Sequence, residues 1–165
     1  RQARIEVWRD PFKYFKTTGW QTSQGLLALA SGGIFGVGLG NSRQKQNYIP
    51  EPQNDFIFAI FAEEWGFIGV IVIISLFIFL IARGLQISAK APDLFGRLIA
   101  IGVSSLIGLQ IIGNLAVVSN TIPVTGISLP LFSYGGSSII TIFIAIGLLV
   151  SISRVANKSE KENRI

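Results

Sequence analysis

The residues best suited to chemistry are three carboxylates, Asp55, Glu63 and Glu64, which stand at the entrance to an apolar stretch long enough to cross a membrane. Ionisable groups at that depth are costly unless they face water, a partner or a substrate. A carboxylate at a water–lipid boundary can act as a general base that takes a proton from an attacking hydroxyl. Asp55 is therefore the candidate catalytic base.

Asp55 also has a simpler interpretation. It follows Asn54 and directly precedes the apolar run Phe-Ile-Phe-Ala-Ile-Phe at 56–61. A side-chain oxygen at such a position commonly accepts hydrogen bonds from the free N–H groups of a helix start. A cap would also fix the side chain that then reacts, so the sequence leaves both roles open.

The two glutamates differ in their relation to Asp55. On a continuous helix that begins near Asp55, Glu63 lies about 80° round the axis and Glu64 roughly on the opposite side. Glu63 could thus share the face of Asp55 as a residue that binds substrate or a metal, or it could mark the interfacial end of the span. Glu64 is expected to mark that end.

Two further groups of polar residues flank this segment. Arg43 and Lys45 lie shortly before Asp55; most such charges are solvated, but here they would also suit an anionic lipid pyrophosphate. Ser137 belongs to the small polar motif Ser-Tyr-Gly-Gly-Ser-Ser at 133–138. That motif indicates either close helix packing through small residues or hydrogen bonding to a polar headgroup.

The composition predicts the class of protein that must position these residues. The chain has 165 residues, of which 50% are hydrophobic and only 14% are charged, whereas soluble domains carry about 25% charged residues. No charged residue and no histidine occurs from Leu98 to Ser153. The pattern predicts an all-α polytopic membrane protein.

The same composition excludes several kinds of site. The chain has no cysteine and no histidine, which excludes thiol catalysis, disulfides and the usual zinc ligand sets. Its net charge of +5 is spread along the chain and does not form the basic stripe of a nucleic-acid binder. We therefore expect no nucleic-acid partner.

Apolar runs predict three transmembrane helices at about 65–83, 97–118 and 137–153. The loop between the first two and the tail after the third are both basic, while the Pro/Gly-rich connection 114–136 has no charge. The positive-inside rule places the loop and the tail in the cytoplasm. The predicted organisation is a large extracytoplasmic loop region (1–64), a three-span bundle (65–154) and a cytoplasmic tail (155–165).

Within the outer region, Gly25–Gly40 is uncharged and rich in glycine. It predicts either a short buried or interfacial helix followed by a glycine loop, or a re-entrant element that lines a cavity. Irregular backbone is tolerated at membrane depth only where protein or water satisfies its polar groups.

Several motifs together resemble one family. They are Ser-Gly-Gly-Ile-Phe-Gly-Val-Gly-Leu-Gly at 31–40, Ile-Pro-Glu-Pro-Gln-Asn-Asp-Phe-Ile-Phe-Ala at 49–59, Glu-Glu-Trp-Gly-Phe-Ile-Gly at 63–69 and Ile-Pro-Val-Thr-Gly-Ile-Ser-Leu-Pro at 122–130. They are similar to those of the SEDS family, which comprises FtsW, RodA and SpoVE. The form of the last motif resembles the FtsW/SpoVE branch more than RodA.

The resemblance implies a peptidoglycan glycosyltransferase that polymerises lipid II at the outer face of the bacterial plasma membrane, for division or cell-wall growth. Family members have about ten spans, so the chain is expected to be the C-terminal portion of a longer protein and inactive alone. Asp55 aligns with the family's essential loop carboxylate and would act as general base. Arg43 and Lys45 would offset the pyrophosphate charge, and a divalent cation such as Mg²⁺ or Mn²⁺ could act with them.

The implied partners are a class B penicillin-binding protein transpeptidase, other membrane proteins of the division or elongation machinery, and membrane lipids, at the division septum. Two alternatives remain at this point. A lipid II flippase should place polar groups deep in its spans, and the uncharged run Leu98–Ser153 disfavours it. A non-catalytic scaffold that recruits division proteins is compatible with the sequence.

Overall fold

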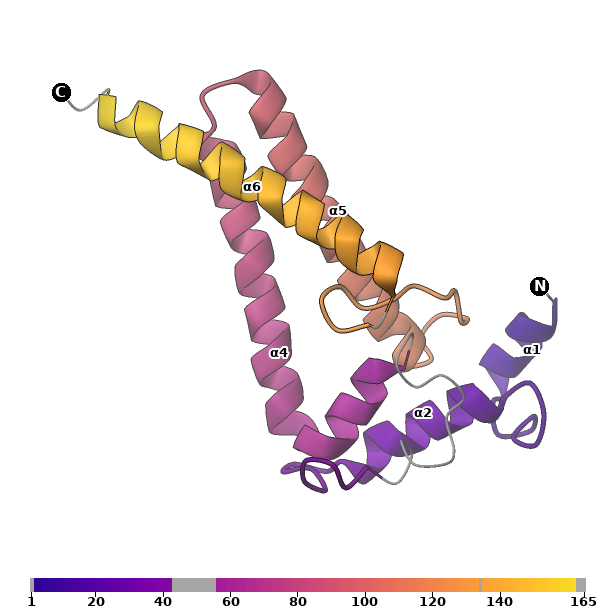
Figure 1. Ribbon diagram of the computed structural model, residues 1–165. Helices are drawn as coiled ribbons and strands as arrows, with labels where there is room; N and C mark the ends of the chain where they lie inside the picture. The colour runs from indigo at the N-terminus through magenta and orange to yellow at the C-terminus, as the bar shows by residue number, and fades with distance from the viewer. Residues whose placement is uncertain (1, 43–55, 134, 163–165) are drawn as a thin grey trace.

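The computed structural model describes residues 2–42, 56–133 and 135–162, and within these ranges it is helical, without strands. The helices of this part of the chain are α1 (Gln2–Arg9), α2 (Trp20–Ser31), α4 (Ile57–Lys90), α5 (Leu94–Val118) and α6 (Gly136–Glu162). Figure 1 shows α4 and α5 side by side, with α6 crossing both at an angle. The predicted all-α class is confirmed.

Three of these helices, α4, α5 and α6, are long and apolar enough to cross a membrane. Only 17% of the most apolar window of α4 is buried within the chain, because side chains such as Phe67, Leu76 and Phe79 are exposed. Such a helix is stable only where its surface meets lipid or other transmembrane segments. The three predicted spans are therefore present.

The helices extend further than the apolar runs predict. Arg83, the expected end of the first span, lies inside α4, and the connection to α5 is only Ala91–Asp93. Likewise α6 continues past Arg154 to Glu162, beyond the predicted end of the third span at 153. The difference arises because long cationic side chains extend toward water from within a helix, so a charge ends the apolar run without ending the helix.

The start of α5 is set by a side-chain cap. Asp93 has an extended backbone, and its carboxylate accepts a 2.6 Å hydrogen bond from the amide N of Gly96. This bond satisfies one of the free N–H groups of the first turn. Nearby, Ser88 Oγ donates to the carbonyl of Arg97 at 3.1 Å, which ties the end of α4 to the start of α5.

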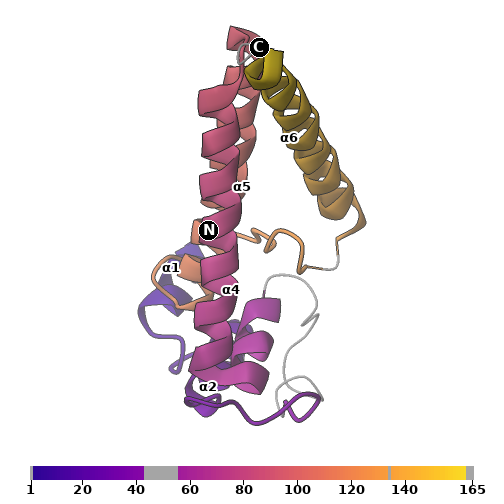
Figure 2. The same ribbon diagram turned by 90° about the vertical axis from the view of Figure 1, so that its left-hand side faces the viewer.

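The two ends of the bundle differ in content. One end holds the α4–α5 turn and the end of α6, whereas α1, α2 and the connection between α5 and α6 gather at the other (Figures 1 and 2). The placement of residues 1–64 and the Pro/Gly connection on one side of a membrane stays a prediction, as does the side that faces the cytoplasm.

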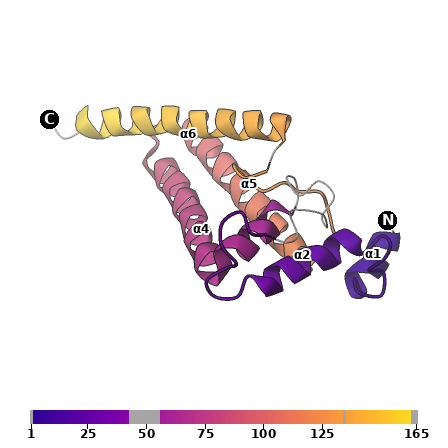
Figure 3. The same ribbon diagram turned by 60° about the horizontal axis from the view of Figure 1, so that its bottom comes forward.

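Gly25–Gly40 was expected to form either a short helix followed by a glycine loop or a re-entrant element that lines a cavity. The helix is α2, which begins earlier than that segment, at Trp20, and ends at Ser31; the loop follows it. Figure 3 shows α2 lying along the first part of α4. Its buried Ala28 belongs to the same hydrophobic core as Phe56 and Ala59. The first residues of α4 therefore pack against α2.

Candidate functional site

The candidate site lies at a sharp bend in α4, where Gly66 interrupts the helix. Gly66 has φ 67° and ψ −166°, a conformation outside the helical region. The interruption divides α4 into a short arm, residues 57–65, and a long arm, residues 67–90, and Figure 2 shows the short arm folded back beside the long one. The first predicted span, at 65–83, thus includes the bend at its start.

The loop after α2 supplies the hydrogen bonds that the bend removes. A broken helix leaves carbonyls without partners before the break and N–H groups without partners after it. Loop amides donate to the carbonyls before Gly66, and loop carbonyls accept from the amides after it. The four bonds run from Val37 N to Glu63 O (3.0 Å), Gly38 N to Glu64 O (3.2 Å), Phe67 N to Gly33 O (2.9 Å) and Ile68 N to Ile34 O (3.3 Å).

This pairing requires two glycines at the contact. A Cβ on Gly36 would collide with the carbonyl oxygen of Glu64, and a Cβ on Gly66 would collide with the amide N of Gly36. Both residues also have positive φ, 78° and 67°, which side-chain-bearing residues rarely adopt. The glycine-rich loop after α2 therefore holds the bend through backbone contacts.

Glu63 is buried beside this loop. Its side chain is 1% exposed, and its Oε2 accepts a 2.5 Å hydrogen bond from Ser42 Oγ, which is also buried. A buried carboxylate is tolerated when it is hydrogen-bonded. This environment favours a role in anchoring the chain at Ser42 over direct contact with a substrate.

The residue that starts α4 is anchored as well. Phe56 is fully buried, and its ring lies so close to Gly25 of α2 that a Cβ there would collide with it. Phe56 also occupies the N-cap position of α4, without a side-chain cap hydrogen bond. The interpretation of Asp55 as a residue that caps this helix stays a prediction, because Asp55 lies outside the described residues.

Aromatic rings connect the two arms of α4 with the connection between α5 and α6. Phe61 stacks on Trp65 within the short arm, with ring centroids 5.9 Å apart. Phe132, in the connection between α5 and α6, meets Phe61 edge-on at 5.8 Å and Phe77 of the long arm at 6.0 Å. Such pairs stabilise by about 0.5–1.5 kcal/mol each beyond their buried area, so the cluster links both arms to the connection.

The predicted site residues fall into two groups. Asp55, Arg43 and Lys45 lie outside the described residues. Ser137 lies at the start of α6, is exposed, and accepts a 2.9 Å bond from Thr141 Oγ1 through its carbonyl. Within the described ranges no cluster of three or more Asp, Glu, His or Cys side chains could hold a metal ion.

Sequence reasoning missed Ser42 and Asn114. Asn114 is fully buried near the end of α5, and its Nδ2 donates to the carbonyl of Ile127 at 2.7 Å. This bond holds the connection against the bundle. The amide of Asn114 within a long uncharged run could have indicated such a contact, because polar groups buried in a membrane need partners. Ser42 carried no comparable signal.

Comparison with known proteins decides the family. The family model for FtsW, RodA and SpoVE, described as a cell cycle protein, matches residues 1–158. This chain belongs to the FtsW/RodA/SpoVE family. The resemblance inferred from the motifs is therefore confirmed.

Relatives and solved structures agree with the family. Stage V sporulation protein E of Bacillus subtilis is 51% identical over 150 residues, which are 91% of this chain and 40% of that protein. The "Probable peptidoglycan glycosyltransferase FtsW" of the same organism is 46% identical over 164 residues, 99% of this chain and 41% of that protein. The chain thus spans about two fifths of the length of these relatives.

Two solved structures share the fold. A chain from a peptidoglycan synthase complex, studied for its structural coordination of polymerization and crosslinking, matches with a TM-score of 0.71 and 32% identity, over 94% of this chain and 42% of that one. The rod shape determining protein RodA of Thermus thermophilus matches with a TM-score of 0.59 and 39% identity, over 78% of this chain and 38% of that one.

Proposed function

We propose that the protein containing this chain is a peptidoglycan glycosyltransferase that polymerises lipid II at the outer face of the bacterial plasma membrane. Membership of the FtsW/RodA/SpoVE family supports the activity, as does the name of the FtsW relative. The observation that carries the site is that both residues flanking 43–55, Ser42 and Phe56, are buried and held. The segment with Arg43, Lys45 and Asp55 thus begins and ends at fixed points.

The proposed reaction uses Asp55 as general base. Its carboxylate takes the proton from the 4-hydroxyl of the acceptor's N-acetylglucosamine, and that oxygen attacks the anomeric carbon of the donor's N-acetylmuramic acid. The bond from that carbon to the pyrophosphate oxygen breaks, and undecaprenyl pyrophosphate leaves with the bonding electrons. An α-linked donor becomes a β-1,4 linkage, so a single inverting displacement needs no covalent enzyme intermediate.

The other residues have supporting roles in this proposal. Arg43 and Lys45 offset the charge that develops on the leaving pyrophosphate, alone or with a divalent cation such as Mg²⁺ or Mn²⁺. Glu63 holds Ser42, and through it the start of the segment. Ser137 is exposed at the same end of the bundle, where it could bind a polar headgroup.

The name of the synthase complex supports a partner that crosslinks the strands, for which we propose a class B penicillin-binding protein transpeptidase. Other membrane proteins of the division or elongation machinery would bind this pair of proteins. If the protein acts in division, the assembly would lie at the division septum. The broad apolar surface of α4 offers area for such contacts or for lipid.

A reconstitution experiment tests the activity. The full-length protein is supplied with lipid II in detergent, and glycan polymer is measured; in parallel it is placed in vesicles, and the passage of lipid II across the bilayer is measured. We expect polymer without passage. Passage without polymer would identify a flippase, and neither activity together with normal recruitment of the transpeptidase would identify a scaffold.

A further inference from the structure

A second candidate site lies between α4 and α6, at the end of the bundle that holds the α4–α5 turn. The two helices enclose a cavity of about 210 Å³. Its lining residues are spaced at i, i+3, i+4 or i+7, so they form one stripe along each helix. The stripe on α4 consists of Arg83, Gln86, Ile87 and Lys90, and the stripe on α6 consists of Ser153, Ala156 and Asn157. Neither the motifs nor the proposed reaction assigns a role to this cavity.

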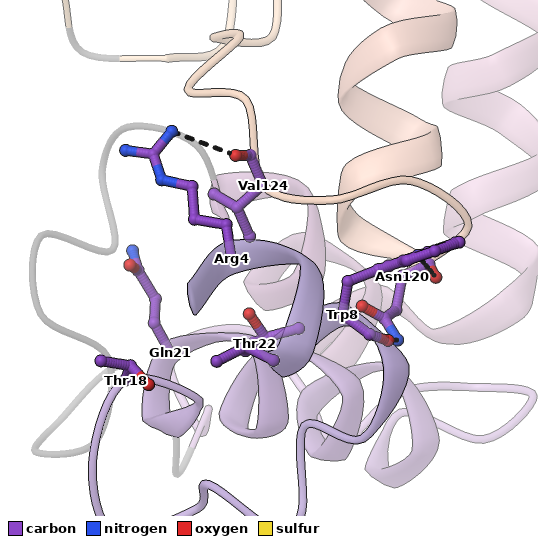
Figure 4. Close-up of a pocket in the computed structure, with 8 residues that line it drawn as sticks. Arg4, Trp8, Thr18, Gln21, Thr22, Asn120 and Val124 are labelled. Atoms are coloured by element: carbon purple, nitrogen blue, oxygen red, sulfur yellow. Dashed lines mark hydrogen bonds between the residues drawn. The ribbon is translucent and has the colours of Figure 1, made fainter. Parts of the chain in front are cut away.

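The cavity is distant from the elements that hold the proposed glycosyltransferase site. Between Gly66 and Arg83 the helix rises by about 25 Å. Ser42 and Phe56, which flank the segment with the proposed base, are held at the other end of the bundle. The first bonds to the short arm of α4, and the second packs on α2, which lies at that end (Figures 1 and 2). The larger cavity between α1, α2 and the connection after α5 lies there too (Figure 4).

The charges that line the cavity between α4 and α6 are positive. Arg83 and Lys90 line it, and no carboxylate occurs among the described residues of its lining. Guanidinium groups form strong hydrogen bonds with phosphate oxygens. The amide of Asn157, on the opposite wall, can donate to the same oxygens. The lining therefore suits an anion that accepts several hydrogen bonds.

The surrounding end of the bundle is basic as well. Residues 83–97 and 153–162 contain six Lys or Arg and three Asp or Glu. One of the three acids, Asp93, caps α5, and the other two, Glu160 and Glu162, follow the lining stripe of α6. The positive-inside rule predicts that this end faces the cytoplasm. Basic pockets between transmembrane helices on that side of a membrane bind anionic headgroups.

Arg83 and the walls of the cavity are held in place by contacts within the chain. Arg83 Nη1 donates a 3.1 Å hydrogen bond to Gln86 Oε1, and its guanidinium lies 5.8 Å from the centroid of the Phe79 ring. The bond to Gln86 uses one of the five N–H groups of the guanidinium. Leu149 of α6 is buried, and its Cδ1 would lie 3.7 Å from a Cβ on Gly84 of α4. Such a preformed site lowers the cost of ordering on binding.

The cavity also lies at the level where two predicted spans end. The first and third predicted spans end at Arg83 and Ser153, and both residues line the cavity. About one turn closer to the middle of these spans, Phe79 and Val150 expose apolar side chains. Phospholipids place their phosphates at this boundary, beside the hydrocarbon core. A soluble anion or an acidic peptide would make no use of the adjoining apolar surface, so the position favours a lipid.

We propose that this cavity binds the headgroup phosphate of an anionic phospholipid. Arg83 donates to a phosphate oxygen, Lys90 adds positive charge, and Asn157 donates from the opposite wall, so that the lipid links α4 to α6. The cavity is smaller than the roughly 300–1,000 Å³ of sites that enclose a drug-sized ligand. The acyl chains therefore lie outside it, along the exposed apolar surfaces of α4 and α6. The inference goes beyond the proposed function, because it involves neither the proposed base nor a sugar substrate.

The test measures lipid binding to the full-length protein in neutral detergent by native mass spectrometry. The protein is supplied with phosphatidylglycerol, which is anionic, or with phosphatidylcholine, which is zwitterionic, and we expect the wild type to prefer the first. Arg83→Gln should weaken the binding of phosphatidylglycerol about tenfold or more, since a hydrogen bond between charged groups is lost. Equal binding of phosphatidylglycerol by wild type and Arg83→Gln would overturn the proposal.

Arg154→Gln is the matched control. Arg154 is an exposed arginine of α6 that does not belong to the lining stripe. Its loss removes only the general attraction of a surface charge, so affinity should fall by no more than about fivefold. Equal weakening by Arg154→Gln and Arg83→Gln would show a diffuse attraction to anionic membranes and would also refute the cavity as the site.

Asn157→Asp provides a second variant, of nearly unchanged shape. It places a carboxylate in the cavity, which should repel a phosphate and prevent the binding of phosphatidylglycerol while binding of phosphatidylcholine stays the same. Phosphatidylglycerol should also raise the melting temperature of the wild type relative to phosphatidylcholine. Both Arg83→Gln and Asn157→Asp should lose most of this rise, and similar melting temperatures in phosphatidylcholine would show that the variants fold.

A competition experiment distinguishes a lipid headgroup from a soluble phosphate. Glycerophosphoglycerol carries the same phosphodiester as phosphatidylglycerol but has no acyl chains. It should not displace bound phosphatidylglycerol at equal concentration, because the lipid also contacts the apolar surfaces. Displacement at equal concentration that depends on Arg83 would identify a site for soluble phosphates and would contradict the assignment to a lipid.

Discussion

Ser42 and Glu63 are joined by a buried 2.5 Å hydrogen bond that spans 21 positions of the chain. It links the end of the glycine loop to the short arm of α4, one turn before the Gly66 bend. Together with the burial of Phe56, this bond fixes both boundaries of residues 43–55. The proposed base lies in that segment, so we expect changes at the bend to alter the rate of the proposed reaction.

Glu63 is predicted to act through position rather than through charge. Glu63→Gln keeps an oxygen that accepts from Ser42 and should retain most of the polymerisation rate. Glu63→Ala removes the acceptor of the buried bond from Ser42 Oγ, and loss of a buried hydrogen bond of this kind costs about 1–3 kcal/mol. We expect Glu63→Ala to lower both the melting temperature and the rate, as measured on the full-length protein with lipid II.

Ser42→Ala provides the matching half of the pair. If the bond acts as described, the effects of Ser42→Ala and Glu63→Ala on the free energy of unfolding should be strongly non-additive in the double variant. A Glu63→Gln protein that folds normally but makes no polymer would instead show that the charge of Glu63 acts on substrate.

Substitution of Gly36 in the loop after α2 is predicted to destabilise the protein more than substitution of Gly40. Both glycines have φ 78°, but a Cβ at Gly36 would strike the carbonyl of Glu64, whereas a Cβ at Gly40 meets nothing within 4 Å. Gly40→Ala should cost about 1–2 kcal/mol from the left-handed backbone alone. Gly36→Ala should cost roughly 2–5 kcal/mol because overpacking adds to it.

The comparison of these two variants separates the effect of the contact with α4 from that of backbone strain. Thermal unfolding of the full-length protein in detergent gives the two melting temperatures. An equal decrease in melting temperature for Gly36→Ala and Gly40→Ala would mean that the contact between the loop and α4 does not hold the bend.

The sequence was a good guide to the spans and a poor one to the bend. Apolar runs predict transmembrane spans well because every residue of the run adds to its hydropathy. The helix ends were predicted less well, because Arg83 and Arg154 interrupt the apolar runs without ending α4 and α6. The bend depends on pairings such as Val37 N to Glu63 O. These are backbone contacts between residues 26 to 34 positions apart, and they leave no side-chain pattern except the glycines themselves. Glu63 and Glu64 both precede the bend, within the short arm, and there Glu63 is buried whereas Glu64 is partly exposed.

The close contact of α4 with α5 depends on Gly84 and Ser104. A Cβ on Gly84 would collide with Ser104 Oγ, as expected where small residues let two transmembrane helices approach. Gly84→Ala should destabilise the bundle by roughly 1–3 kcal/mol, and Ser104→Ala should partly restore the stability of that variant. Gly147→Ala is the control, since a Cβ there meets nothing within 4 Å. Failure of Ser104→Ala to rescue would place the cost elsewhere.

The Trp8–Asn120 pair is predicted to hold α1 on the connection. Asn120 has φ 56°, a conformation that asparagine tolerates better than most residues. Asn120→Gly keeps the backbone conformation but removes the bond to the carbonyl of Trp8, and Trp8→Phe removes the indole donor. Each should cost about 0.5–1.5 kcal/mol, measured by the melting temperature, and Asn120→Val should cost more. A stable Asn120→Val protein would contradict the left-handed conformation.

The most direct test of the account compares Asp55→Asn with Glu51→Gln in the full-length protein. Both changes neutralise a carboxylate of the same segment, and the initial rate of glycan polymer formation from lipid II is measured for each. Because removal of a general base typically lowers the rate about 10²–10⁴-fold, we predict that loss for Asp55→Asn and a rate near wild type for Glu51→Gln. Polymer formation by Asp55→Asn at the wild-type rate would contradict the assignment of the base.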